Sequence, residues 1–152
     1  MNDSNVIVDV QNVFKKFLIP GTWPWSEKGE VEAVSDVSFK LSPGEVVALV
    51  GQSGSGKTTL ARCILGLEGV SSGSISIEGQ SWHDLPEKKR RALRKKYQYV
   101  PQDALSALDP QQTAIEHVVE SLVVLAGVDR ERAILQGTSM LEQLGLGERL
   151  HA

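Results

Sequence analysis

Hydrophobic positions in the first third of the chain follow the two-residue period of β-strands. Val6–Val10 is short and β-branched and predicts one strand, and Val31–Leu41 alternates well enough to predict another. Between them, Ile19–Glu30 holds two prolines and two glycines, which predicts a loop. Glu45–Val50 is apolar after its first residue, which predicts a strand buried on both faces of a parallel sheet.

The middle of the chain alternates between helical and extended patterns. Thr58–Leu67 is apolar almost all round and predicts a helix enclosed between layers. Gly73–Gly79 alternates serine with isoleucine, which predicts an antiparallel, half-solvated strand. Pro86–Lys96 predicts a basic helix with proline near its first turn, and Tyr97–Val100 predicts a further strand.

The last third is helical. Thr113 is a candidate N-cap for a helix over residues 113–126, because Glu116 follows at the capping-box spacing. Asp129 is a candidate N-cap for a second helix, which we expect to end near Leu144. A strand–loop–helix centre with added antiparallel strands and a helical tail predicts an α/β fold.

A glycine-rich loop separates the apolar run from the first helix. Gly51–Thr58, GQSGSGKT, fits the pattern G-x-x-x-x-G-K-[ST] at every fixed position. Glycines let the backbone turn tightly and approach phosphate oxygens, and the helix start adds a positive dipole end. A chance glycine–serine turn is the alternative, but a strand before the loop and a helix after it favour a phosphate site.

Each position of this loop has an expected role. Lys57 is expected to reach the β- and γ-phosphates, the Thr58 hydroxyl to coordinate Mg²⁺, and Thr59 to assist at the α-phosphate. The predicted nucleotide-binding residues of the loop are Gly51, Gln52, Ser53, Gly54, Ser55, Gly56, Lys57, Thr58 and Thr59.

Composition narrows the class of protein. A chain of 152 residues predicts one domain, and a net charge of -3 argues against a domain-wide basic surface for nucleic acid. The single cysteine, Cys63, excludes a disulfide framework within the chain and is expected to be a small core residue. No secretory signal is visible and no apolar run approaches the ~20 residues that span a bilayer. We therefore expect any membrane role to come through a partner.

One short segment of the chain is strongly basic. Lys88–Lys96 holds seven of the 16 lysines and arginines. A nucleic-acid patch is one interpretation. The run contains no aromatic residue and the chain is acidic overall, so a solvated helix face is favoured and no nucleic acid is expected as a partner.

The order of these features resembles the nucleotide-binding subunit of ABC transporters. Ala33–Trp82 is similar to the N-terminal half of that family, and Leu93–Thr113, LRKKYQYVPQDALSALDPQQT, is similar to its Q-loop segment. The Leu108-Asp109-Pro110 tail and the insert 19–30 resemble the oligopeptide, dipeptide and nickel importer branch. Ala104 and Gln111 depart from that branch, in which proline and arginine are common.

The resemblance implies an ABC-type P-loop NTPase core. Its parts would be an N-terminal antiparallel β subdomain (6–44 and 73–79), the P-loop strand and helix (45–67), the Q-loop segment (97–110) and the start of the helical subdomain (113–150). It also implies ATP and Mg²⁺ as ligands, a transmembrane permease and a second ATP-binding subunit as partners, and a peripheral place at the cytoplasmic face of the membrane.

The resemblance adds two residues to the expected site. Phe17 falls where the family places an aromatic ring that stacks on adenine, and a buried core residue is the alternative. Gln102 falls at the Q-loop glutamine, which would bind Mg²⁺ or orient the attacking water, and a solvated loop residue is the alternative. The expected catalytic residues are thus Lys57 and Gln102, and the expected metal ligands are Thr58 and Gln102.

The 152 residues contain no LSGGQ signature, no apolar run ending in Asp-Glu and no later switch histidine. We therefore expect an ABC-type domain truncated before the signature motif, with nucleotide binding and little hydrolysis. We also expect Val46–Val50 to lack a neighbouring strand on one side and to expose an apolar face. A non-catalytic nucleotide- or partner-binding P-loop fragment is the alternative. A small kinase or GTPase is disfavoured because the chain has no N-K-x-D motif.

Overall fold

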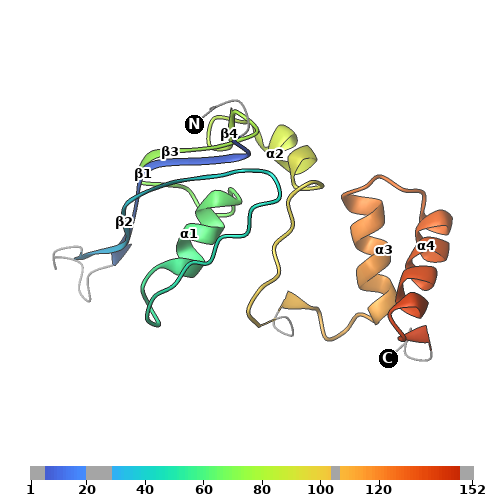
Figure 1. The fold of residues 1–152 in the computed structure, drawn as a ribbon. Coiled ribbons are helices and arrows are strands. Elements are labelled where there is room, and N and C mark those ends of the chain that lie inside the picture. Colours follow the sequence, from blue (N-terminus) through green and yellow to red (C-terminus); the bar gives the residue numbers. More distant parts are fainter. Residues whose placement is uncertain (1–5, 20–28, 104–106, 148–152) are drawn as a thin grey trace. The chain divides into compact units, whose positions relative to one another are not determined.

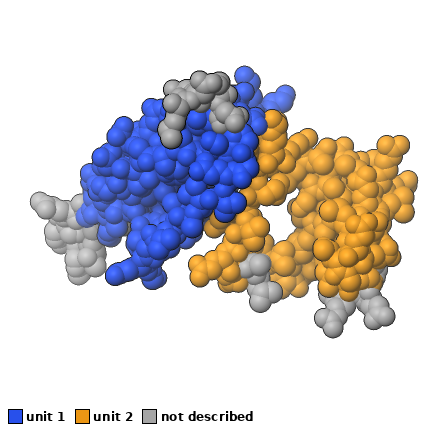
Figure 2. Space-filling model, in the orientation of Figure 1, with its two compact units in different colours: residues 1–90 blue, residues 91–152 orange. Residues whose placement is uncertain are grey.

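The computed structural model describes residues 6–19, 29–103 and 107–147. It divides into two units, residues 1–90 and 91–152, and each is described by itself (Figure 2). The elements in chain order are β1 (Val8–Ile19), β2 (Gly29–Leu41), α1 (Lys57–Ile64), β3 (Ser72–Ile77), β4 (Gln80–Ser81), α2 (Glu87–Leu93), α3 (Ala114–Val124) and α4 (Arg130–Gln143). Most of the predicted loop 19–30 lies outside the described residues. Among the described residues, no helix has the length and apolar character needed to cross a membrane.

A four-stranded sheet in the order β2-β1-β3-β4 forms the first unit (Figure 1). All three neighbouring pairs are antiparallel, and β1 and β2 remain paired from Val8 opposite Leu41 to Ile19 opposite Gly29. A two-residue turn joins β3 to β4, with φ of 50° at Glu78 and 73° at Gly79. Two positive φ angles match the twist of a hairpin. The antiparallel strand predicted over residues 73–79 is therefore confirmed over residues 73–77, and residues 78–79 form the turn instead.

The central strand β1 is longer and less regular than predicted. Its pairing with β2 shifts register between Val10 and Lys16, and Asn12 has a φ of 45°. A β-bulge breaks the alternation of side chains, so the pattern predicted only Val6–Val10 as a strand. Gly73 passes close to this bulge, because a Cβ there would overlap the carbonyl oxygen of Asn12.

Helix α1 packs on one face of this sheet. The buried core joins four sheet residues to two helix residues, namely Val10, Val13, Val34 and Ile75 with Leu60 and Cys63. The buried Cys63 confirms its predicted core position. The predicted enclosure of the helix is wrong: Thr58 and Arg62 are exposed, because the described sheet covers only one side of α1.

Two predicted strands are absent from the described sheet. Residues 45–50 and 97–100 form no paired strand, and Val46, Val50 and Val100 are 95%, 93% and 84% exposed. A strand needs a neighbour to bond its backbone, and no described strand pairs with either segment. The predictions of a buried strand over residues 45–50 and of a strand over residues 97–100 are wrong, whereas the exposed apolar face expected for residues 46–50 is present.

A helical hairpin forms the second unit. Thr113 caps α3 in a full capping box: its side chain accepts from the Glu116 amide, and the Glu116 carboxylate accepts from the Thr113 amide at 2.8 Å. Asp129 caps α4 through the Glu131 amide. Both predicted N-caps are confirmed. The two helices bury a small shared core, formed by Ile115, Val119, Ala133 and Leu141.

Replacing Thr113 by alanine should lower the free energy of unfolding of this hairpin by about 1 kcal/mol, because a first-turn amide loses its acceptor. Chemical denaturation followed by circular dichroism would measure the loss. Ser121→Ala is the control, since Ser121 is exposed within α3. Equal stability of Thr113→Ala and wild type would contradict the capping role.

Candidate functional site

The glycine-rich loop lies between residues 45–50 and the start of α1. Gly54 and Gly56 have φ of 79° and 86°, a region open mainly to glycine. Gly56 is the N-cap of α1 and contributes no side chain over the first helical amides. A Cβ on Gly56 would overlap the carbonyl oxygen of Ala33 on β2. The free amides of a helix start, next to glycine, form a suitable anion site.

The side chain of Lys57 folds back into this loop. Its ammonium donates to the carbonyl oxygens of Gly51 and Gln52, at 2.9 and 2.6 Å, and to the Ser55 hydroxyl at 3.2 Å. All three acceptors are neutral. A phosphate entering the loop would therefore offer this cation a charged acceptor, which makes a shorter and stronger hydrogen bond.

A cavity of about 510 Å³ opens between this loop and strand β2. Its lining combines β2 residues with the loop and the start of α1: Glu32, Ala33, Val34, Ser35, Val37, Leu49, Val50, Gly51, Gly54, Ser55, Gly56, Lys57 and Leu60. A smaller hollow of about 160 Å³ shares Gly54–Lys57 and adds Thr58 and Thr59. The structure thus brings most of the predicted loop residues together, while Gln52 and Ser53 lie exposed outside both linings.

Phe17 lies on β1, opposite Val31 of β2, and is 39% exposed. Phe17 is therefore not a fully buried core residue. Phe17 does not line the cavity, but its strand neighbours the β2 residues that do.

Gln102 is exposed and follows Pro101 in a loop of the second unit. Every other predicted site residue belongs to the first unit. Because each unit is described by itself, the role of Gln102 at the phosphate loop stays a prediction.

Several contributors to the site were missed by the sequence pattern. The wall formed by residues 32–37 of β2 carries no motif, and its approach to Gly56 depends on tertiary packing. Lys15 was also missed, although its ammonium lies 4.7 Å from the centre of the Phe17 ring. Lys15 and Phe17 are two residues apart on a strand, so their side chains lie on one face, and this spacing could have predicted their contact.

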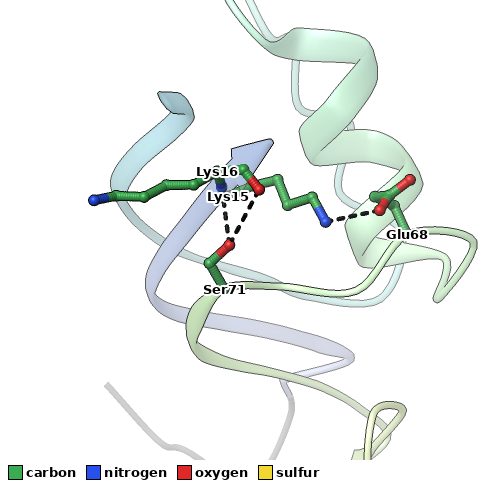
Figure 3. A network of polar contacts seen from close by, with 4 residues as sticks. All are labelled: Lys15, Lys16, Glu68 and Ser71. Carbon is green, nitrogen blue, oxygen red and sulfur yellow. Dashed lines mark hydrogen bonds and ion pairs between the residues drawn. The ribbon is translucent and has the colours of Figure 1, made fainter. Parts of the chain in front are cut away.

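A carboxylate completes this second cluster (Figure 3). Glu68 pairs with the Lys15 ammonium at 2.7 Å, and this hydrogen bond lowers the pKa of the Glu68 carboxyl. Burial raises the pKa of the Cys63 thiol, so it stays a neutral core group at physiological pH. Among the described residues, no group of three or more His, Cys, Asp or Glu side chains could hold a metal ion.

Comparison with known proteins identifies the family. The family model described as ABC transporter matches residues 34–151. This chain belongs to the ABC transporter family. The predicted resemblance and the α/β fold class are both confirmed, since solved ATP-binding cassettes match the structure as well.

Named relatives of this ABC transporter chain include the glutathione import ATP-binding protein GsiA from Escherichia coli O157:H7 and from Escherichia coli K12. Each is 36% identical over 144 residues, which cover 95% of this chain and 23% of GsiA. The MJ0796 cassette, solved as a post-hydrolysis dimer bound to ADP and Pi, matches with a TM-score of 0.76 and 26% identity. That match covers 95% of this chain and 60% of the cassette, so the chain spans only part of its relatives.

Gly56→Ala should destabilise the first unit more than Gly54→Ala. Both glycines have positive φ, which strains any L side chain by about 1–2 kcal/mol. Only Gly56 would also overlap the Ala33 carbonyl, whereas a Cβ on Gly54 meets open space. Denaturant unfolding of the two variants measures the difference, and equal losses of stability would contradict the contact.

The Lys15–Glu68 pair should make stability depend on pH. The lowered folded pKa of Glu68 means that its contribution is present above the ordinary carboxyl pKa of 4.5 and is lost as the pH falls through the lower folded value. The difference in unfolding free energy between wild type and Glu68→Gln should therefore shrink on acidification. Unfolding curves from neutral to acid pH measure it, and a difference independent of pH would contradict the pair's role.

Proposed function

We propose that this chain binds Mg²⁺-ATP through Gly51–Thr59 as the nucleotide-binding part of an ABC-type importer. One observation carries the proposal: the Lys57 ammonium lies inside a glycine loop at the start of α1, where the acceptors that hold it among the described residues are all neutral. A cation and free helical amides converging on one loop suit the phosphates of a nucleotide.

Each part of the nucleotide has a proposed contact. The loop amides and Lys57 would bind the β- and γ-phosphates, and Thr59 the α-phosphate end. Mg²⁺ binds few protein ligands and keeps phosphate and water oxygens, so the exposed Thr58 hydroxyl fits it. Gln102 is proposed as a further Mg²⁺ ligand or water-orienting residue, and the Phe17 ring as the platform for adenine.

Hydrolysis by these 152 residues alone is proposed to be slow. The family activity is ATP hydrolysis, but this sequence holds no signature motif and no apolar strand ending in Asp-Glu. Without the carboxylate of that strand, no side chain would activate the water that attacks the metal-bound nucleotide. The alternative is a non-catalytic nucleotide- or partner-binding P-loop fragment, and one observation supports it, the exposure of Val46 and Val50.

Cargo and partners are proposed from the relatives. GsiA is named for the import of glutathione, and glutathione is a small peptide. The sequence also resembles the importer branch for peptides and nickel. We therefore propose a peptide-like cargo, with nickel as the alternative. A permease would hold the chain at the cytoplasmic face of the membrane, and a second ATP-binding subunit would pair with it, as cassettes pair in the dimeric MJ0796 structure.

Calorimetric titration with Mg²⁺-ATP tests nucleotide binding. Lys57→Gln should weaken the affinity about 10- to 100-fold, because a charge-assisted hydrogen bond to phosphate is worth about 1.5–3 kcal/mol. Lys88→Gln, a charge-matched change on exposed α2, should bind like wild type. Heat that is the same for wild type and Lys57→Gln would contradict the proposal. Phosphate release faster from the mixture with a permease than from the chain alone would exclude the non-catalytic alternative.

A further inference from the structure

Lys15 is held between an aromatic ring and a carboxylate. Its ammonium lies over the Phe17 ring, 4.7 Å from the ring centre. The same ammonium lies 2.7 Å from a Glu68 carboxylate oxygen (Figure 3). Only 12% of the Lys15 side chain is exposed, against 45% for its neighbour Lys16. Lysine is rarely buried to this extent unless it is paired. The burial therefore indicates a fixed side chain and not a mobile surface charge.

The neighbouring contacts hold β1 in place at this point. Lys16 lies on the opposite face of the strand, where its ammonium is 3.6 Å from Glu30 and 3.9 Å from Glu32. The Lys16 amide donates to the Ser71 hydroxyl at 2.9 Å. Ser71 follows Glu68 in the segment after α1, so this segment binds both the backbone of β1 and the Lys15 side chain (Figure 3).

The segment after α1 is in turn fixed to that helix. The amides of Leu67 and Glu68 both donate to the carbonyl oxygen of Arg62, in the last turn of α1. The helix that begins at the phosphate loop is therefore hydrogen-bonded at its last turn to the segment whose Glu68 carboxylate holds Lys15. These contacts connect the proposed phosphate and base contacts through one short rigid element.

We propose that Lys15 is a positioning residue that fixes the Phe17 ring as a platform for the nucleotide base. The ammonium covers one face of the ring and attracts its π electrons, which restrains the ring. The residue keeps 39% of its surface exposed, and this exposed surface is free to stack on a purine. The inference rests on the proposed nucleotide binding and extends it to the base.

A double-mutant cycle tests this role with two ligands, Mg²⁺-ATP and Mg²⁺-tripolyphosphate, which lacks a base. Lys15→Met keeps the aliphatic stem and removes the charge. It should weaken the binding of Mg²⁺-ATP about three- to tenfold and leave the affinity for Mg²⁺-tripolyphosphate unchanged. Lys15→Arg should restore ATP affinity, since guanidinium also stacks on rings and pairs with carboxylates. Lys16→Met, which removes the ion pairs on the other face of the strand, should leave the affinity for both ligands unchanged.

Phe17→Leu supplies the other arm of the cycle. In that background, Lys15→Met should have no further effect on ATP affinity, because the ring through which it acts is gone. Additive losses, or equal losses for ATP and tripolyphosphate, would overturn the positioning role and indicate a structural one. Failure of the wild-type chain to bind either ligand would instead overturn the proposed function, and this inference with it.

Discussion

The approach of Gly56 to the Ala33 carbonyl is the contact on which the site depends. It brings the glycine loop against β2, and without a Cβ at residue 56 the loop can meet the sheet backbone directly. The start of α1, the Lys57 side chain and the wall of the cavity all follow from this approach. A local backbone requirement at Gly56 thus shapes a site whose other wall includes Ala33, 23 residues earlier in the sequence.

Features that depend on neighbouring residues were predictable from the sequence. The capping box of Thr113 and Glu116, the cap of Asp129 and the glycine loop depend on spacings of a few residues, and the structure contains all three. The family followed from the order of such motifs and is confirmed by the match over residues 34–151. Local chemistry of this kind leaves a direct signal in the sequence.

Features that depend on residues distant in the sequence could not be predicted from the sequence. Residues 45–50 and 97–100 have strand composition, but strand formation requires a neighbour that supplies hydrogen bonds, and the described sheet offers none to them. The bulge near Asn12 hid most of β1, because register shifts remove the alternation on which the prediction relied. The contact of Lys15 with Phe17 and Glu68 joins two elements, so only its strand half was visible in sequence.

The neutral acceptors around Lys57 have a practical consequence. A cation held by two carbonyl oxygens and a hydroxyl gives up no ion pair when an anion arrives. If the loop binds a nucleotide as proposed, small oxyanions of a buffer, such as inorganic phosphate or sulfate, would compete for the same amides and the same ammonium. The apparent affinity for a phosphorylated ligand would then depend on the salt chosen for the solution as well as on the ligand.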